Sequence, residues 1–184
     1  MFKQEIIFNK LEAKKFKKQI ETDFSHKEYY KSTTVGVSKN KVASKGYSSR
    51  NSYNISFNFN ENLTNILLPK LKKYNINSLP PYGQLLRYSE GHFFKPHRDN
   101  GVDEISHRFR TLIIQLSESN DYTGGKLSVW TPSGNKVISD STIGNLILFN
   151  SNYLHEVSML KTGIRYAMVM WLTHDNFNKT TTLI

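Results

Sequence analysis

The chain has 184 residues, of which 38% are hydrophobic and 12% aromatic, and it carries a formal net charge of +10. This length predicts one domain with its own core, and the apolar content excludes a disordered chain. Because the chain contains no cysteine, disulfides, thiolate zinc sites and cysteine nucleophiles are excluded, so any metal must be bound by imidazole and carboxylate groups.

The first elements expected along the chain are an amphipathic helix and an exposed loop. Residues 9–29 carry Leu11, Phe16 and Ile20 among cations, which predicts an amphipathic helix packed on a larger body. Residues 31–53 are rich in Ser, Lys, Gly, Thr and Asn and predict an exposed loop, a candidate lid.

A strand and a second helix follow the candidate lid. Residues 52–59 alternate polar and apolar side chains, as a strand with one buried face does. Residues 62–74 place most of their apolar side chains on one side, which predicts a helix that ends before Pro80 and Pro81.

Beyond Pro81 the sequence predicts a series of short strands. Turn signals separate them at 89–91, 120–125, 132–135 and 161–163. The expected strands are 84–88, 93–97, 110–116, 126–131, 136–138, 146–150, 156–160 and 166–172. We therefore expect a mostly β protein with flanking α-helices, in which a double-sheet jelly roll forms the core and the N-terminal helices pack outside.

Three residues form a candidate metal site. His97 and Asp99 lie two apart at a predicted strand end, so both side chains point to one face. A His-x-Asp pair alone carries little information, but His155 follows a distant apolar strand that a barrel would bring close. Two imidazoles and one carboxylate are the facial triad of non-haem iron(II) oxygenases, and no fourth ligand is evident for a structural zinc.

Arg165 opens the last apolar strand, ten residues after His155. An arginine that enters a buried strand needs a partner, and its planar fork suits a carboxylate. A keto-diacid would satisfy both groups by chelating the metal at one end and meeting the guanidinium at the other.

At this point residues 84–172 closely resemble the iron(II)- and 2-oxoglutarate-dependent oxygenase superfamily, in its prolyl 4-hydroxylase-like branch. The stretches that carry the resemblance are LLRYSEGHFFKPHRD, RFRTLIIQLSE, YTGGKLSVW and NLILFNSNYLHEVSMLKTGIRYAMVMWL. The resemblance implies that His97, Asp99 and His155 are catalytic iron ligands, that Arg165 binds the distal carboxylate of 2-oxoglutarate, and that Tyr88 donates a hydrogen bond to it.

Further roles are implied by the same resemblance. Arg108 and Trp171 fall where related prolyl hydroxylases contact substrate, and residues 31–53 fall where those enzymes have a segment that closes over it. Ala167 stands where many relatives have a hydroxyl residue, which predicts one fewer hydrogen bond to the co-substrate. Tyr88 also fits a strand aromatic, Arg108 a solvated charge and Trp171 a core residue.

The resemblance implies an activity and a domain plan. We expect an L-ascorbate-supported dioxygenase that uses iron(II), 2-oxoglutarate and O2 to hydroxylate substrate, with decarboxylation of 2-oxoglutarate to succinate and CO2. The plan is a single domain, 1–184, made of an N-terminal helical and lid region (1–81), a jelly-roll catalytic core (82–174) and a C-terminal tail (175–184). His26, His92, His107 and His174 have no partner at ligand spacing and are interpreted as surface or packing residues.

The substrate class stays open between four alternatives. We expect a prolyl residue in an exposed segment of a protein or peptide; the second alternative is a free amino acid or another small molecule. A nucleic-acid demethylase would fit the positive charge, but that branch carries an arginine where this chain has Trp171. The fourth is a non-catalytic binding module.

With neither a signal-peptide pattern nor a membrane span, we expect a cytoplasmic protein without membrane contact, and the sequence does not indicate an oligomeric state.

Overall fold

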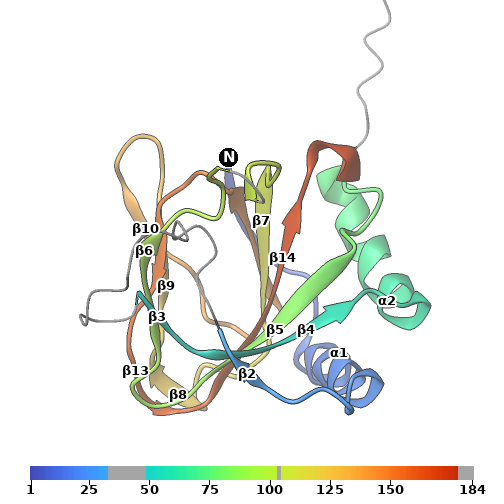
Figure 1. Cartoon of the computed structure of the whole chain (residues 1–184), viewed down its shortest axis with the longest axis horizontal. Coiled ribbons are helices and arrows are strands. Elements are labelled where there is room, and N and C mark those ends of the chain that lie inside the picture. Colours follow the sequence, from blue (N-terminus) through green and yellow to red (C-terminus); the bar gives the residue numbers. More distant parts are fainter. Residues whose placement is uncertain (33–48, 103–104, 178–184) are drawn as a thin grey trace, which may run out of the picture.

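The computed structural model describes residues 1–32, 49–102 and 105–177, which form two main antiparallel sheets packed face to face, with two α-helices on the outer face of the larger sheet (Figure 1). This architecture confirms the predicted fold class, a jelly-roll core with the N-terminal helices outside it. Within the described residues, no helix is both long and apolar enough to span a membrane.

Seven of the described strands form the larger sheet, in the order β1-β11-β7-β14-β5-β4-β2. Their bounds are β1 Phe2–Ile6, β11 Asn145–Asn150, β7 Arg110–Gln115, β14 Arg165–Leu172, β5 Tyr82–Tyr88, β4 Tyr53–Asn58 and β2 Tyr30–Lys31. Because side chains alternate along a strand, β7 directs Thr111, Ile113 and Gln115 to the space between the sheets, and Leu112 and Ile114 to the helices. The central strands are therefore apolar on both faces.

Five of the described strands form the smaller sheet, in the order β10-β9-β12-β6-β3, and β13 pairs with β8 beside it. Their bounds are β10 Lys136–Ile138, β9 Leu127–Trp130, β12 His155–Val157, β6 Phe93–His97, β3 Arg50–Asn51, β13 Leu160–Gly163 and β8 Tyr122–Gly124. The central pair β12 and β6 brings together two segments almost sixty positions apart in sequence, which matters for the site.

Helix α1 (Lys10–Asp23) begins at a capping box, in which the Asn9 side chain accepts from the Glu12 amide and the Glu12 carboxylate accepts from the Asn9 amide. Phe16 and Ile20 are buried against the larger sheet, as predicted. Leu11 is 61% exposed, so its predicted place on the packing face was wrong. Leu11 lies five residues before Phe16, which places it about 140° around the helix from that buried residue.

Helix α2 (Glu61–Leu71) is capped by Asn60 and continues into a 3₁₀ turn, η1 (Lys72–Tyr74), which together match the predicted 62–74 helix. Leu63, Leu67 and Leu71 are fully buried at a spacing of four residues, so one stripe faces the core. The two helices and the outer face of the larger sheet enclose one hydrophobic cluster, and the space between the sheets contains a second.

Several sequence predictions differ from the observed strands. The N-terminal strand β1 was not predicted, since a five-residue edge strand with one intermediate and four exposed side chains leaves no clear apolar pattern. Strand β8 lies within the predicted turn 120–125, and the predicted turn 161–163 lies in β13. The predicted strand 156–160 is divided between β12 and β13, because the chain leaves the smaller sheet after Val157 to pair with β8.

The predicted lid at 31–53 is only partly described. Its ends lie in β2, which pairs with β4, and in β3, which pairs with β6, so the ends join the two sheets. Residues 33–48, where the body of the lid was predicted, lie outside the described residues, as does most of the predicted tail.

Candidate metal centre and adjoining cavity

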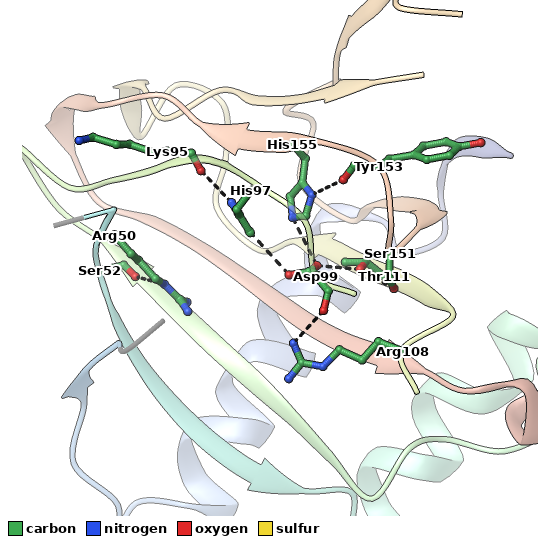
Figure 2. Close-up of polar contacts among 10 residues, drawn as sticks. All are labelled: Arg50, Ser52, Lys95, His97, Asp99, Arg108, Thr111, Ser151, Tyr153 and His155. Carbon is green, nitrogen blue, oxygen red and sulfur yellow. Dashed lines mark hydrogen bonds and ion pairs between the residues drawn. The ribbon is translucent and has the colours of Figure 1, made fainter. Parts of the chain in front are cut away.

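The three predicted metal ligands converge at one end of the smaller sheet (Figure 2). His97 ends β6 and His155 begins β12, and the two residues face each other in the antiparallel register. Asp99 follows two residues after β6; its Oδ1 lies 3.6 Å from His97 Nε2, and its Oδ2 lies 3.3 Å from His155 Nε2. One ligand atom from each residue lies within 4.8 Å of the others, a spacing that one divalent cation can bridge.

Backbone carbonyls orient both imidazoles. His97 Nδ1 donates to the Lys95 carbonyl at 2.8 Å, and His155 Nδ1 donates to the Tyr153 carbonyl at 3.0 Å. A ring that donates from Nδ1 presents the lone pair of Nε2, and both Nε2 atoms face Asp99. The site therefore offers two imidazole nitrogens in the tautomer that binds a metal.

Asp99 is held by a buried hydroxyl pair that the sequence analysis did not identify. Thr111 Oγ1 donates to Asp99 Oδ2 at 2.7 Å and lies 3.0 Å from Ser151 Oγ, and the Asp99 amide donates to the Ser151 carbonyl at 2.9 Å (Figure 2). Neither Thr111 nor Ser151 is exposed to solvent. These contacts fix the carboxylate before any metal binds.

The surroundings set the protonation of the three groups. Burial disfavours the charged form of Asp99, but the His155 and His97 imidazoles beside it hold the pKa of this carboxyl well below its usual value. Burial lowers the pKa of His97. Burial also acts to lower the pKa of His155, but the charge of Asp99, its hydrogen bond and the Tyr153 carbonyl together outweigh burial and raise that pKa. Asp99 is thus ionised and His97 neutral at neutral pH.

Among the described residues, no fourth histidine or acidic side chain joins this group. A structural zinc site normally has four protein ligands, whereas a 2-His-1-carboxylate group leaves positions open for exogenous ligands. The donor set therefore fits iron(II) better than a closed zinc site. His26, His92, His107 and His174 lie outside the group.

Arg165 lies between the sheets, where it is 1% exposed. Its Nη2 donates to Gln115 Oε1 at 2.9 Å, and its guanidinium carbon lies 5.4 Å from the centre of the Tyr88 ring. Within the described structure, Arg165 Nε and the hydroxyls of Tyr88 and Tyr122 are buried without a hydrogen-bond partner. Buried donors of this kind require an acceptor, and a carboxylate would satisfy them, so this chamber fits the distal end of 2-oxoglutarate.

Gly125 gives the chamber its space. It has a φ of +58°, and a Cβ at this position would lie 2.5 Å from Leu160 Cδ1 and 3.3 Å from Arg165 Cδ. Ala167 is fully buried and pairs with Gln115 in the register of β14 and β7. The amide of Gln115 is thus the polar side chain that accompanies Arg165 here, and sequence reasoning missed it.

A cavity of about 150 Å³ opens beside the three metal-binding candidates. Trp171 and Arg108 both line it, and the Arg108 guanidinium stacks on the Trp171 ring at 3.9 Å. The lining residues are Tyr30, Arg50, Asn54, Gln84, Leu86, Tyr88, Phe94, His97, Arg98, Asp99, Ile105, Arg108, Ile113, Leu127, His155, Val157, Val169 and Trp171. Arg50, Asn54 and Gln84 are further lining residues that the sequence analysis did not select.

A jelly roll with two histidines and an aspartate at the cavity wall, and a buried arginine behind it, defines the class of non-haem metal oxygenase folds. Comparison with protein families agrees, because the model of the 2OG-Fe(II) oxygenase superfamily matches residues 83–173. The chain belongs to the 2OG-Fe(II) oxygenase superfamily, and this family implies iron(II) and 2-oxoglutarate as cofactor and co-substrate.

Curated relatives carry the name PKHD-type hydroxylase. The protein from Shewanella baltica is 34% identical over 90 residues, and that from Caulobacter vibrioides is 36% identical over 92 residues. Each alignment covers 47% of this chain and 40% of the relative, so the chain spans about two fifths of the length of these relatives.

Solved structures show the same fold at low sequence identity. A prolyl hydroxylase from Trichoplax adhaerens, in complex with a peptide fragment of the hypoxia inducible factor oxygen degradation domain, has a TM-score of 0.71 at 17% identity, covering 95% of this chain and 84% of that chain. A prolyl-4-hydroxylase from Pseudomonas putida has a TM-score of 0.65 at 15% identity, covering 94% of this chain and 91% of that chain.

Proposed function

We propose that this protein is an iron(II)- and 2-oxoglutarate-dependent dioxygenase that hydroxylates a prolyl residue in a protein or peptide. The observation that carries this proposal is the pairing of the His97, Asp99 and His155 group with a buried, incompletely paired Arg165. Membership of the superfamily supports the oxygenase class, and the relatives' names support the prolyl substrate.

Each group has one task in this proposal. His97, Asp99 and His155 hold iron(II), while Arg165 and Tyr88 receive the distal carboxylate of 2-oxoglutarate. Iron(II) with 2-oxoglutarate and O2 supplies the oxidant that hydroxylates an unactivated carbon, and 2-oxoglutarate is decarboxylated to succinate and CO2.

The rest of the cavity orients substrate and excludes water. Its inner walls are formed by Leu86, Ile113, Leu127, Val157 and Val169, which keep the reacting region apolar. In this proposal, Trp171 and Arg108 at the cavity wall contact the substrate. Thr111 keeps the Asp99 carboxylate in place through its 2.7 Å hydrogen bond.

The second candidate function is hydroxylation of a free amino acid or a similar small molecule. The observation that favours it is the size of the cavity, since about 150 Å³ accommodates one compact group and is well below the usual range for larger ligands.

The experiment combines purified protein with iron(II), 2-oxoglutarate, ascorbate as supporting reductant, and panels of proline-containing peptides and free amino acids. Mass spectrometry measures the gain of one oxygen atom by the substrate, and succinate is measured in the same samples. We expect hydroxylation coupled to succinate on a prolyl peptide. His155→Ala removes a proposed ligand and should abolish both signals, whereas the matched variant His174→Ala, outside the metal group, should retain them. Absence of succinate with every substrate would contradict an oxygenase and favour a binding module.

A further inference from the structure

The cavity beside the metal-binding group carries excess positive charge. Among the described lining residues, the side chains that are charged at neutral pH are Asp99, whose pKa is lowered, and the three arginines Arg50, Arg98 and Arg108. In the proposed function the charge of Asp99 is taken up by the metal. The remaining guanidinium groups therefore favour an anion in the cavity.

Arg108 presents unsatisfied donors on one wall. Its guanidinium lies over the Trp171 ring at 3.9 Å, and its Nη1 makes a long hydrogen bond of 3.4 Å to the Asp99 carbonyl. Arg108 Nε and Trp171 Nε1 are both buried, and neither has a hydrogen-bond partner among the described residues. Two adjacent buried N–H groups without an acceptor are costly unless a ligand supplies one.

Arg50 supplies the second charge from another strand. It is 8% exposed and pairs with Phe94 in the register of β3 and β6. Its guanidinium lies 4.6 Å above the Phe94 ring, which stacks on the proposed ligand His97 with 3.4 Å between ring centres. Figure 2 shows the guanidinium groups of Arg50 and Arg108 directed toward the space between them, beside the triad. Both residues line the same cavity.

We propose that Arg108 and Arg50 select a substrate that carries a carboxylate close to the carbon that is hydroxylated. This inference rests on the proposed function and names the substrate class of the same site. The carboxylate belongs either to a free amino acid or to an acidic residue that flanks the target proline, because the same guanidinium groups bind either one. Tyr88 lines this cavity and Arg165 does not, so the cavity adjoins the 2-oxoglutarate chamber, and Arg108 and Arg50 are charges distinct from Arg165.

The test compares ligands that differ only in charge. Two pairs are used: L-proline with L-prolinamide, and N-acetyl-prolyl-aspartate amide with N-acetyl-prolyl-asparagine amide. Calorimetry with manganese(II) and 2-oxoglutarate present measures Kd without turnover, and Trp171 fluorescence in a Trp130→Phe background reports ligand at this wall. We expect the acidic member of at least one pair to bind about tenfold tighter or more, the usual size of a hydrogen bond to a charged group. The pair that discriminates identifies the source of the carboxylate.

Variants separate the arginines from a general charge effect. Arg108→Gln and Arg50→Gln should each reduce the difference between acidic and neutral ligands, while leaving the affinity for 2-oxoglutarate unchanged. Arg87→Gln is the matched control: it removes the same charge from β5, but its neighbours Leu86 and Tyr88 line the cavity and Arg87 does not. This control should keep the full difference.

Two results would overturn the inference: equal affinity for both members of both pairs, or a preference that persists in Arg108→Gln and in Arg50→Gln. Failure of the proposed function has a different readout: the unaltered protein would neither bind 2-oxoglutarate nor form succinate. A protein that forms succinate but binds acidic and neutral ligands equally contradicts only the carboxylate inference.

Discussion

Replacing Arg165 by methionine should abolish 2-oxoglutarate binding without destabilising the metal-loaded protein. The side chain is buried, and within the described residues it has no acidic partner, with Gln115 Oε1 as its hydrogen-bond acceptor. Removing one member of a buried charge pair costs about 3–5 kcal/mol, so the Kd for 2-oxoglutarate should rise about 150- to 4,000-fold.

Without the co-substrate, Arg165→Met should leave the free energy of unfolding unchanged or raise it slightly. A buried guanidinium that is not paired with a carboxylate bears a desolvation penalty, which the Gln115 amide and the Tyr88 ring offset only in part. An apolar side chain of similar length avoids that penalty. We therefore expect Arg165→Met to unfold at the same temperature as the unaltered protein or slightly higher.

Thermal unfolding with manganese(II), with and without 2-oxoglutarate, tests both statements. In the unaltered protein, 2-oxoglutarate at about 100 times its Kd should add about 2.7 kcal/mol to the free energy of unfolding. For a chain of this length that corresponds to a rise in Tm of about 5–10 °C. Arg165→Met should show no rise, and Arg87→Met should show the full rise. A variant that loses several degrees of Tm but still responds to 2-oxoglutarate would refute the assigned role of Arg165.

Three further outcomes are expected. Metal affinity should fall by up to about tenfold per pH unit as the pH drops through the pKa of His155, because the metal must then displace a proton. The Asp99 carboxylate raises that pKa above the usual value of about 6.5 for histidine. Competition titrations between pH 6 and about 8.5 should show this slope, and a flat profile would contradict it. Thr111→Val should weaken metal binding about 10- to 100-fold by releasing the carboxylate, as measured by the same titration, whereas Thr123→Val at an exposed threonine pair should not. Gly125→Ala should lower the free energy of unfolding by about 1–2 kcal/mol, because φ is positive at this position. It should also weaken 2-oxoglutarate binding, because the added Cβ displaces Leu160. An unchanged midpoint in chemical denaturation would count against this prediction.

Candidate site residues can be predicted from the sequence when they lie close together along the chain or when a charge would have to be buried. His97 and Asp99 are two residues apart, and Arg165 is a charge at the start of an apolar strand, so each leaves a signal in a short window. His155 required the assumption that β12 lies beside β6. The structure contains that pairing, with His155 opposite His97.

Arg50 could not have been identified in this way. It lies in a two-residue strand whose neighbour is β6, and the pairing that stacks it on Phe94 joins positions more than forty residues apart. Its flanking sequence is polar and predicts only a loop. Such short, non-local strands leave no periodic pattern, because two residues contain only a single repeat of the strand alternation.

Thr111 and Gln115, in contrast, were within reach of the sequence. In the strand RTLIIQ, these two residues and Ile113 alternate and so lie on one face. The same alternation places Arg165, Ala167 and Trp171 on one face of β14. When both faces of a strand are buried, a polar side chain on either face loses its hydration and needs a hydrogen-bond partner inside the protein. Polar residues that alternate along such a strand therefore point to a polar site on one face. On β7 and β14 these residues face the space between the sheets, where the candidate metal-binding group and the arginine chamber lie. The inner face of the larger sheet is therefore the surface on which this fold places its chemistry.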